Sequence, residues 1–199
     1  MILIISLLIH PFLVMGQNEL RDRGFSEVLE ESLKRYITDP WYPACIDSID
    51  GGYHNFLDHA FEPTGDQRKV LVQQARHLWT LSNLAMRYPD RKELREYADH
   101  GYTFIRDHMW DEEYGGFFTS VNGRNGPDDG SIIHKNAYAQ SFAIFGLSNY
   151  YLLTTEKEAL ELAYRTFHWL NEHAHDPMNK GYFNNLKRNG TPLHLNATG

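Results

Sequence analysis

The stretch WDEEYGGFF at residues 110–118 combines an acidic residue, a glycine pair and aromatic residues, and this order occurs three times in the chain. An earlier copy spans residues 47–53, and a later copy, in which one glycine is replaced, spans residues 176–183. The second glycine recurs at intervals of 64 and 65 residues, at Gly52, Gly116 and Gly181. Recurrence at a nearly fixed interval is the mark of an internal repeat.

Each copy is predicted to form a tight turn followed by a short extended segment. Glycine adopts the positive φ that such turns require at little cost, and the aromatic residues that follow favour an extended backbone. The repeat therefore predicts three turns of the same kind, and the rest of the chain is organised by what lies between them.

The segments between the turns carry helical patterns. Helices are predicted at about 19–37, 66–87, 91–108, from 134 onward and at 155–173. Asp66 is the predicted N-cap of the second helix, and capping boxes at Asp90–Glu93 and Thr155–Glu158 are predicted to open the third and fifth. Apolar residues lie on one side of the first, third and fifth helices. They lie nearly all round the second and fourth, which predicts that these two helices are buried on all sides.

This alternation favours an all-α toroid, in which an inner ring of helices is wrapped by an outer ring and short β-hairpins lie between outer and inner helices. An open solenoid of helical hairpins is the alternative. Solenoid repeats usually span about 20 to 45 residues, so the longer repeat seen here favours the toroid. We predict an (α/α)6 toroid of which this chain holds an incomplete N-terminal portion, because it contains two and a half repeats.

Composition excludes several classes of function. The net charge of −7 leaves no basic stripe for phosphates, so no nucleic-acid partner is expected. Cys45 is the single cysteine, which excludes an internal disulfide and a cysteine-based zinc cluster and predicts a buried structural thiol. Aromatic residues make up 14% of the chain, which suits a packed core and equally a sugar-binding surface.

The N-terminal segment, residues 1–16, is apolar and gives way to polar residues at Gln17. It is too short to span a bilayer comfortably, which takes about 20 residues. We therefore expect a signal peptide at residues 1–16, a mature domain at 17–199 and a secreted or periplasmic location, with a buried N-terminal segment as the alternative. No other stretch is apolar enough to give a stable membrane span.

Arg76 lies within the apolar second helix, where a charge is costly unless it is paired or faces a polar cavity. It is predicted to bind an anion or a hydroxyl group at the mouth of the toroid, with a structural ion pair as the alternative. His173 and His175 are a weak pair of candidate metal ligands, since no third ligand is placed beside them, and no metal is expected. Glu112 and Glu113 are candidates for a hydrolase acid pair, but neighbours on an exposed turn favour solvation.

Five segments together resemble the N-acylglucosamine 2-epimerase family, and its cellobiose and mannobiose 2-epimerase branch in particular. They are residues 41–43 (WYP), 50–53 (DGGY), 74–82 (QARHLWTLS), 110–117 (WDEEYGGF) and 135–144 (KNAYAQSFAI). The similarity runs from about residue 25 to residue 193. It implies an (α/α)6 barrel that epimerises or isomerises reducing sugars without a metal or a redox cofactor.

The resemblance also implies a mechanism. The sugar ring opens, a histidine takes the proton from C2, an enediolate forms, and a second histidine helps to return a proton to the other face. By position, Arg76 matches the family arginine that contacts the sugar oxygens and stabilises an enediolate. Tyr138 and Phe142 match aromatic positions of the pocket wall. The family's catalytic histidines lie on later inner helices, and none of the eleven histidines here matches them.

The sequence therefore predicts the N-terminal half of a sugar 2-epimerase, which acts on a small-molecule carbohydrate and is inactive as the 199-residue chain alone. Two alternatives stay open. One is a non-catalytic carbohydrate-binding or assembly module that keeps the pocket wall without the base. The other is an (α/α)6 glycoside hydrolase or lyase, which needs a carboxylic acid that projects into the cavity.

Overall fold

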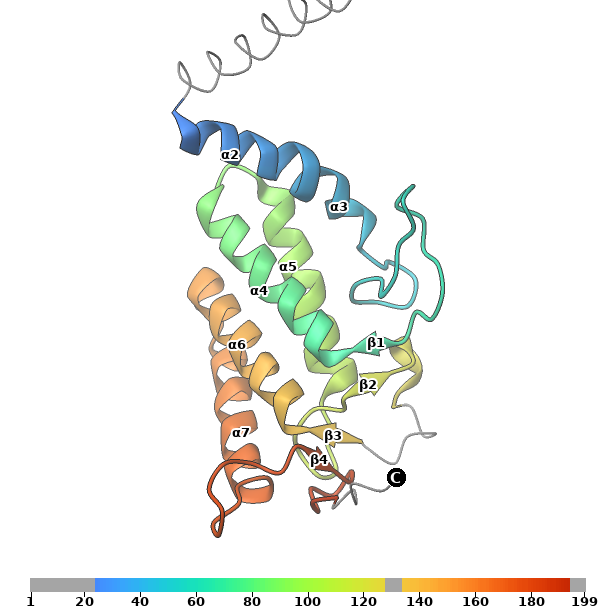
Figure 1. Cartoon of the computed structure of the whole chain (residues 1–199), viewed down its shortest axis with the longest axis vertical. Coiled ribbons are helices and arrows are strands. Elements are labelled where there is room, and N and C mark those ends of the chain that lie inside the picture. Colours follow the sequence, from blue (N-terminus) through green and yellow to red (C-terminus); the bar gives the residue numbers. More distant parts are fainter. Residues whose placement is uncertain (1–23, 128–133, 194–199) are drawn as a thin grey trace, which may run out of the picture. The chain divides into compact units, whose positions relative to one another are not determined.

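The computed structural model describes residues 24–127 and 134–193, which form two compact units that divide after Ala44 (Figure 1). The signal peptide expected at residues 1–16 lies outside the described residues. Within the part of the chain that the structure describes, no helix is both long and apolar enough to span a membrane.

The first unit is a run of short helical segments: α2 spans Phe25–Leu33, the π-helical turn η1 spans Lys34–Thr38, and α3 spans Asp39–Ala44. It contains the described part of the first predicted helix and continues past the predicted end at residue 37. Tyr42 has φ −104° and ψ 112°, outside the helical region, because the ring of Pro43 disfavours a helical backbone in the residue before it. This bend ends the helical run.

The second unit is built from two helical hairpins (Figure 1). In the first, α4 (Leu71–Arg87) is followed by α5 (Lys92–Phe104), which continues as the π-helical turn η2 (Ile105–Met109). In the second, α6 (Ala137–Thr154) is followed by α7 (Lys157–His173). The helices α4 and α6 pack side by side, while α5 packs on α4 and α7 packs on α6. This unit therefore shows the predicted alternation of inner and outer helices.

Short antiparallel strand pairs lie at the N-terminal ends of α4 and α6 (Figure 1). The strand β1 (Lys69–Val70) pairs with β2 (Ser120–Val121), which is followed by the 3-10 turn η3 (Gly123–Asn125). The strand β3 (Lys135–Asn136) pairs with β4 (Asn185–Leu186). In each case the strand before an inner helix pairs with the segment after the next glycine turn, so each pair connects one repeat to the following one.

The second and third helices begin differently from the prediction. Asp66 does not cap α4, because the chain is still extended at Val70, the N-cap position; the Asp66 side chain accepts the backbone N–H of Arg68 instead. The capping box predicted at Asp90 is also wrong, since Arg91 occupies the N-cap of α5 without a side-chain cap bond. Both helices begin later than their polar starting signals suggest.

The fourth and fifth helices depart from the prediction at their boundary. Thr155 is the C-cap of α6, in the left-handed region with φ 59°, and Glu156 caps α7 by accepting the backbone N–H of Glu158. The capping box predicted at Thr155–Glu158 is therefore wrong: the N-cap is one residue later, and the residue three positions after it is Ala159, which cannot reciprocate. The predicted end of α7 at His173 is confirmed. The helix α6 begins at Ala137 with Asn136 as its cap rather than near His134.

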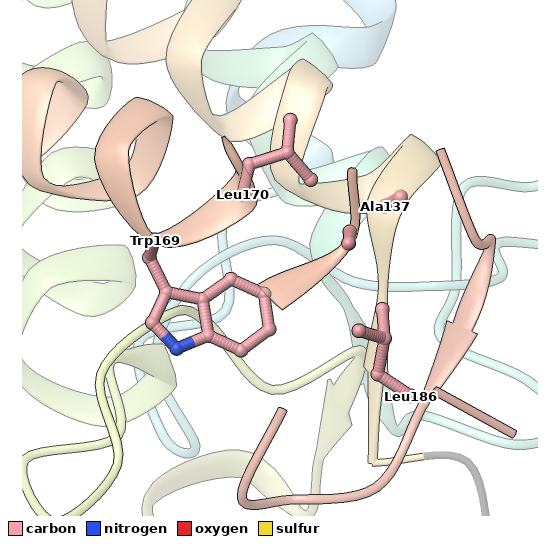
Figure 2. Close-up of a cluster of buried hydrophobic side chains, with 5 residues drawn as sticks. Ala137, Trp169, Leu170 and Leu186 are labelled. Carbon is pink, nitrogen blue, oxygen red and sulfur yellow. The ribbon is translucent and has the colours of Figure 1, made fainter. Parts of the chain in front are cut away.

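Buried side chains gather where the helices meet the strands. One cluster joins α6, α7 and β4 (Figure 2), and it consists of Ala137, Trp169, Leu170, Ala174 and Leu186. The indole N–H of Trp169 donates to the carbonyl of Tyr114 at 2.9 Å, which ties α7 to the second glycine turn. Cys45 is fully buried, as predicted, and burial raises the pKa of its thiol to about 12.

Candidate functional site

The glycine turns are connected to the inner helices by a repeated set of buried polar contacts, which we call the joints. In the first joint, the ammonium of Lys69 contacts Asp47 Oδ2 at 2.5 Å and also donates to the carbonyl of Tyr53. The amide of Gln74, on α4, accepts the backbone N–H of Tyr53 at 2.8 Å and donates to its carbonyl at 2.9 Å. The glutamine therefore pairs with the aromatic residue as a neighbouring strand would.

The second joint repeats these contacts. Lys135 contacts Asp111 Oδ2 at 3.0 Å, and Gln140, on α6, accepts the N–H of Phe117 at 2.9 Å and donates to its carbonyl at 2.7 Å. Arg188 adds a second cation to Asp111, at 2.9 Å. The lysines of both joints are completely buried, so each charge depends on the carboxylate it contacts.

The joint carboxylates are held in their charged form. Burial by itself raises the pKa of Asp111, but hydrogen bonds from Arg188 and Lys135 outweigh burial and bring the pKa below its usual value. The pKa of Asp47 is lowered in the same way, with burial opposed by the hydrogen bond from Lys69. The joint carboxylates are therefore charged at neutral pH, and they connect the glycine turns to the residues that precede α4 and α6.

Opposite the joints, α4 and α6 present a row of exposed and half-buried side chains that we call the stripe. It consists of Val72, Arg76, Trp79 and Asn83 on α4, and of Tyr138, Phe142, Phe145 and Asn149 on α6. Steps of three and four residues place each set along one side of its helix. The stripe therefore combines flat aromatic faces with polar groups that bond to hydroxyls.

Contacts across the two helices hold the stripe together. The guanidinium carbon of Arg76 lies 6.0 Å from the centroid of the Phe142 ring, and that ring meets Tyr138 edge to face at 4.9 Å. Trp79 stacks on Phe145 with centroids 5.3 Å apart, and further along the row Asn83 donates to Asn149 Oδ1 at 3.2 Å. The structure thus brings together the three residues predicted as a binding group, Arg76, Tyr138 and Phe142.

The prediction that the second helix is buried on all sides is wrong. The side chain of Arg76 is exposed, and α4 has an open side where the stripe lies. Apolar residues all round the helix suggested complete burial, but two of them, Val72 and Trp79, lie on its open side. A charge at Arg76 therefore needs no ion pair and is available to a ligand.

The matched family model is that of N-acylglucosamine 2-epimerase (GlcNAc 2-epimerase), and it covers residues 51–198. The chain belongs to the N-acylglucosamine 2-epimerase family. It is 33% identical over 166 residues to the cellobiose 2-epimerase of Bacteroides fragilis, an alignment that covers 81% of this chain and 41% of the relative.

Solved structures agree with this N-acylglucosamine 2-epimerase assignment. The cellobiose 2-epimerase of Bacillus thermoamylovorans superposes with a TM-score of 0.76 at 25% identity, covering 85% of this chain and 42% of that one. That of Spirochaeta thermophila gives 0.75 at 29% identity, with 86% and 42% covered. The predicted fold, an incomplete (α/α)6 toroid, is confirmed, and the chain spans less than half the length of the relatives it matches.

The resemblance makes histidines the acid–base groups of this family, and His77 is the histidine within α4. His77 of α4 packs on the ring of Tyr53, with centroids 4.7 Å apart. Burial, together with the neighbouring charge of Arg76, lowers the pKa of His77 to about 4. His77 is therefore neutral at physiological pH and is part of the scaffold.

The remaining candidates are also peripheral to the stripe. Glu112 and Glu113 are exposed, as predicted, and Glu113 pairs with Arg188 at 3.1 Å. His173 packs against Trp169, and His175 against Tyr182. Among residues 24–127 and 134–193, no group of three or more His, Cys, Asp or Glu side chains is placed to hold a metal ion.

More than half of the stripe was missed by sequence reasoning: Val72, Trp79, Asn83, Phe145 and Asn149 were not among the predicted site residues. A signal for them is present in the sequence. Trp79 and Phe145 are separated by 66 residues, as are Asn83 and Asn149 and as are Arg76 and Phe142. Aligning the sequence of α4 with that of α6 at this interval would have extended the predicted site from three residues to the whole stripe.

Proposed function

We propose that this chain supplies the substrate-binding wall of a sugar 2-epimerase that acts on reducing mono- or disaccharides by removing and returning a proton at C2. The observation that supports it is the stripe itself, in which an exposed arginine lies beside aromatic rings and side-chain amides. Aromatic faces cover the apolar side of a pyranose, while guanidinium and amide groups bond to its hydroxyls.

In this proposal Arg76, Tyr138 and Phe142 contact the substrate. Opening of the ring and loss of the C2 proton create an enediolate, whose negative charge develops on the sugar oxygens. The guanidinium of Arg76 carries a permanent positive charge, and its exposed position beside Phe142 allows it to stabilise that oxygen. Arg76 therefore has a role in binding and in the transition state, while the imidazoles that move the proton come from outside the stripe.

The composition of the inner helices favours this proposal over a glycoside hydrolase. Hydrolases of that kind need a carboxylic acid beside the scissile bond, and neither α4 nor α6 contains an aspartate or a glutamate. Proton transfer at C2 needs no carboxylate on this wall. A non-catalytic sugar-binding module would use the same stripe, so activity distinguishes it from the epimerase.

The test is a chimera in which residues 45–193 of this chain replace the matched portion of the Bacteroides fragilis cellobiose 2-epimerase. The chimera is incubated with cellobiose in D2O, and deuterium at C2 is followed by NMR. We expect incorporation of deuterium and formation of the 2-epimer. Methyl cellobioside, whose ring is locked, serves as the control substrate and should incorporate none.

The same chimera with Arg76→Ala should lose most of this exchange and keep its helical circular dichroism and its melting temperature. A folded chimera that exchanges no deuterium with any reducing sugar contradicts the epimerase proposal. Full exchange in the Arg76→Ala chimera contradicts the role proposed for Arg76 but leaves the epimerase proposal intact.

A further inference from the structure

The third glycine turn folds like the first two. The carboxylate of Asp176 accepts the backbone N–H groups of Met178 and Asn179 at 3.0 and 3.1 Å, as Asp111 accepts those of Glu113 and Tyr114. His175 and Tyr182 form an antiparallel bridge, as Trp110 and Phe117 do in the second turn. The acceptor half of a joint is therefore present a third time.

The donor half has no counterpart among the described residues. In the first two joints a buried lysine meets the aspartate, and a glutamine five residues later pairs with the backbone of the aromatic residue. Within residues 24–127 and 134–193, no lysine pairs with Asp176, and no side chain bonds to the backbone N–H or carbonyl of Tyr182. Hydrogen bonds from Asn179 also keep the pKa of Asp176 below its usual value, so its charge is present at neutral pH.

A groove of about 480 Å³ lies beside this turn, between α6 and α7. Its floor includes Ala137 and Leu170 of the buried cluster (Figure 2), and its walls include Ile144, Phe167 and Tyr182. The groove is mainly apolar, and Phe167 and Tyr182 are each 48% exposed. Large apolar rings that are half exposed to water and lie together are typical of an interaction surface.

One repeat earlier, the corresponding side chains are covered. Tyr102 and Phe117, each 65 residues before Phe167 and Tyr182, are 4% and 0% exposed. They are buried because α6 lies against that face, where Tyr150 stacks on Tyr102 with centroids 4.3 Å apart. The groove beside α6 is therefore the place that a further inner helix would fill.

We propose that the third turn and this groove form a docking site for an amphipathic helix that carries a lysine at its start and a glutamine five residues later. The lysine meets Asp176, the glutamine pairs with the backbone of Tyr182, and the apolar side of the helix covers Phe167 and Ile144. The proposal depends on the repeated joints, and it holds whether or not the chain takes part in epimerisation.

The occupant is a helix of the inner ring from the remaining part of an epimerase-type barrel. The relatives are more than twice as long as the portion that this chain matches, so they contain further polypeptide of this type. A second copy of the chain is a poorer candidate. Its own lysine–glutamine sets, Lys69 with Gln74 and Lys135 with Gln140, are already engaged inside its first two joints.

The probe is a fluorescein-labelled peptide of residues 65–88 of this chain, which carries Lys69 and Gln74 at the required spacing. It is titrated with the 199-residue protein, and binding is followed by fluorescence anisotropy. We expect saturable binding that Asp176→Asn weakens about tenfold or more, the loss of a hydrogen bond to a charged group. A peptide with Lys69→Met should lose a similar factor. Combined with Asp176→Asn it should lose little more, because both changes remove one interaction.

Asp90→Asn, at an exposed carboxylate in the loop between α4 and α5, is the matched control and should leave binding unchanged. Circular dichroism and urea unfolding verify that each variant is folded. Absence of saturable binding, or equal affinity for the wild type and Asp176→Asn, overturns the proposal. A stable dimer of the protein without peptide, measured by light scattering, overturns it in favour of a second copy.

Discussion

The two sides of the inner helices differ in how they use the repeat. On the joint side, α4 and α6 carry the same residues 66 positions apart: the lysines before them, Lys69 and Lys135, and the glutamines within them, Gln74 and Gln140. On the stripe side three of the four equivalent pairs differ, as Arg76 and Phe142 do, and the fourth pair, Asn83 and Asn149, is the same residue twice. Identical residues make the same structural contacts in each joint, whereas the differing pairs of the stripe place chemically different groups on its two helices.

This contrast makes opposite predictions for the two sides. Substitutions in the joints should lower the free energy of unfolding and leave ligand affinity of the folded protein intact. Substitutions in the stripe should weaken ligand binding and change the free energy of unfolding little, because its side chains are exposed or half-buried.

The largest effect is expected from Asp111→Asn. It keeps the bonds to the turn but leaves Lys135, which is completely buried, without its counter-charge. Loss of one partner of a buried pair costs about 3 to 5 kcal/mol, measured by urea unfolding. The double variant Asp111→Asn/Lys135→Met should recover part of that loss, since the buried charge is gone. If the single variant unfolds at the same urea concentration as the wild type, the joints do not stabilise the fold.

Gln140→Leu should come next. It leaves the buried N–H and carbonyl of Phe117 without partners; both groups are neutral, and we expect about 1 kcal/mol for each, the low end of the cost of an unsatisfied buried group. Asn149→Leu, on the same helix but in the stripe, is the matched control and should change unfolding by less than about 0.5 kcal/mol. Equal losses in the two variants would remove the distinction between the sides of α6.

His77 predicts a pH dependence. Its folded pKa is about 4, against 6.5 in the unfolded chain, so between these values only the unfolded state takes up the proton. The free energy of unfolding is therefore unaffected by protonation of His77 above pH 6.5. It falls as the pH is lowered from 6.5 to 4, by up to about 3 kcal/mol. Unfolding free energies measured across this range should show the slope, and His77→Phe should abolish it. His59→Phe, at an exposed site, should retain it.

Much of the fold follows from the sequence because the glycine turns repeat at a regular interval. Gly52 and Gly116 predicted the turns, and the alternation of helix patterns between them predicted inner and outer helices. The lysines and glutamines of the joints escaped notice, although they repeat as well. Single polar residues in apolar surroundings give no local signal of their partner, so Lys69 and Asp47 become a pair only once the chain has folded.

Helix starts and the open side of α4 were harder to predict, for physical reasons. Asp66 has the chemistry of an N-cap, but pairing of β1 with β2 keeps the chain extended up to Val70. Burial of α4 on all sides was predicted from its many apolar residues, whereas an inner helix of a toroid has apolar residues on its open side too. Hydropathy alone does not distinguish the packed side of an inner helix from its open side. The position of the neighbouring helix distinguishes them.

The most direct test of the stripe is a titration of the 199-residue protein with cellobiose, followed through the indole N–H resonance of Trp79 and assigned with Trp79→Phe. We predict a saturable shift in the wild type. Arg76→Ala should weaken the affinity about tenfold or more, the loss of charged hydrogen bonds, with an unchanged free energy of unfolding. The absence of a shift at Trp79 in the wild type, or an affinity for cellobiose that Arg76→Ala leaves unchanged, would contradict the account.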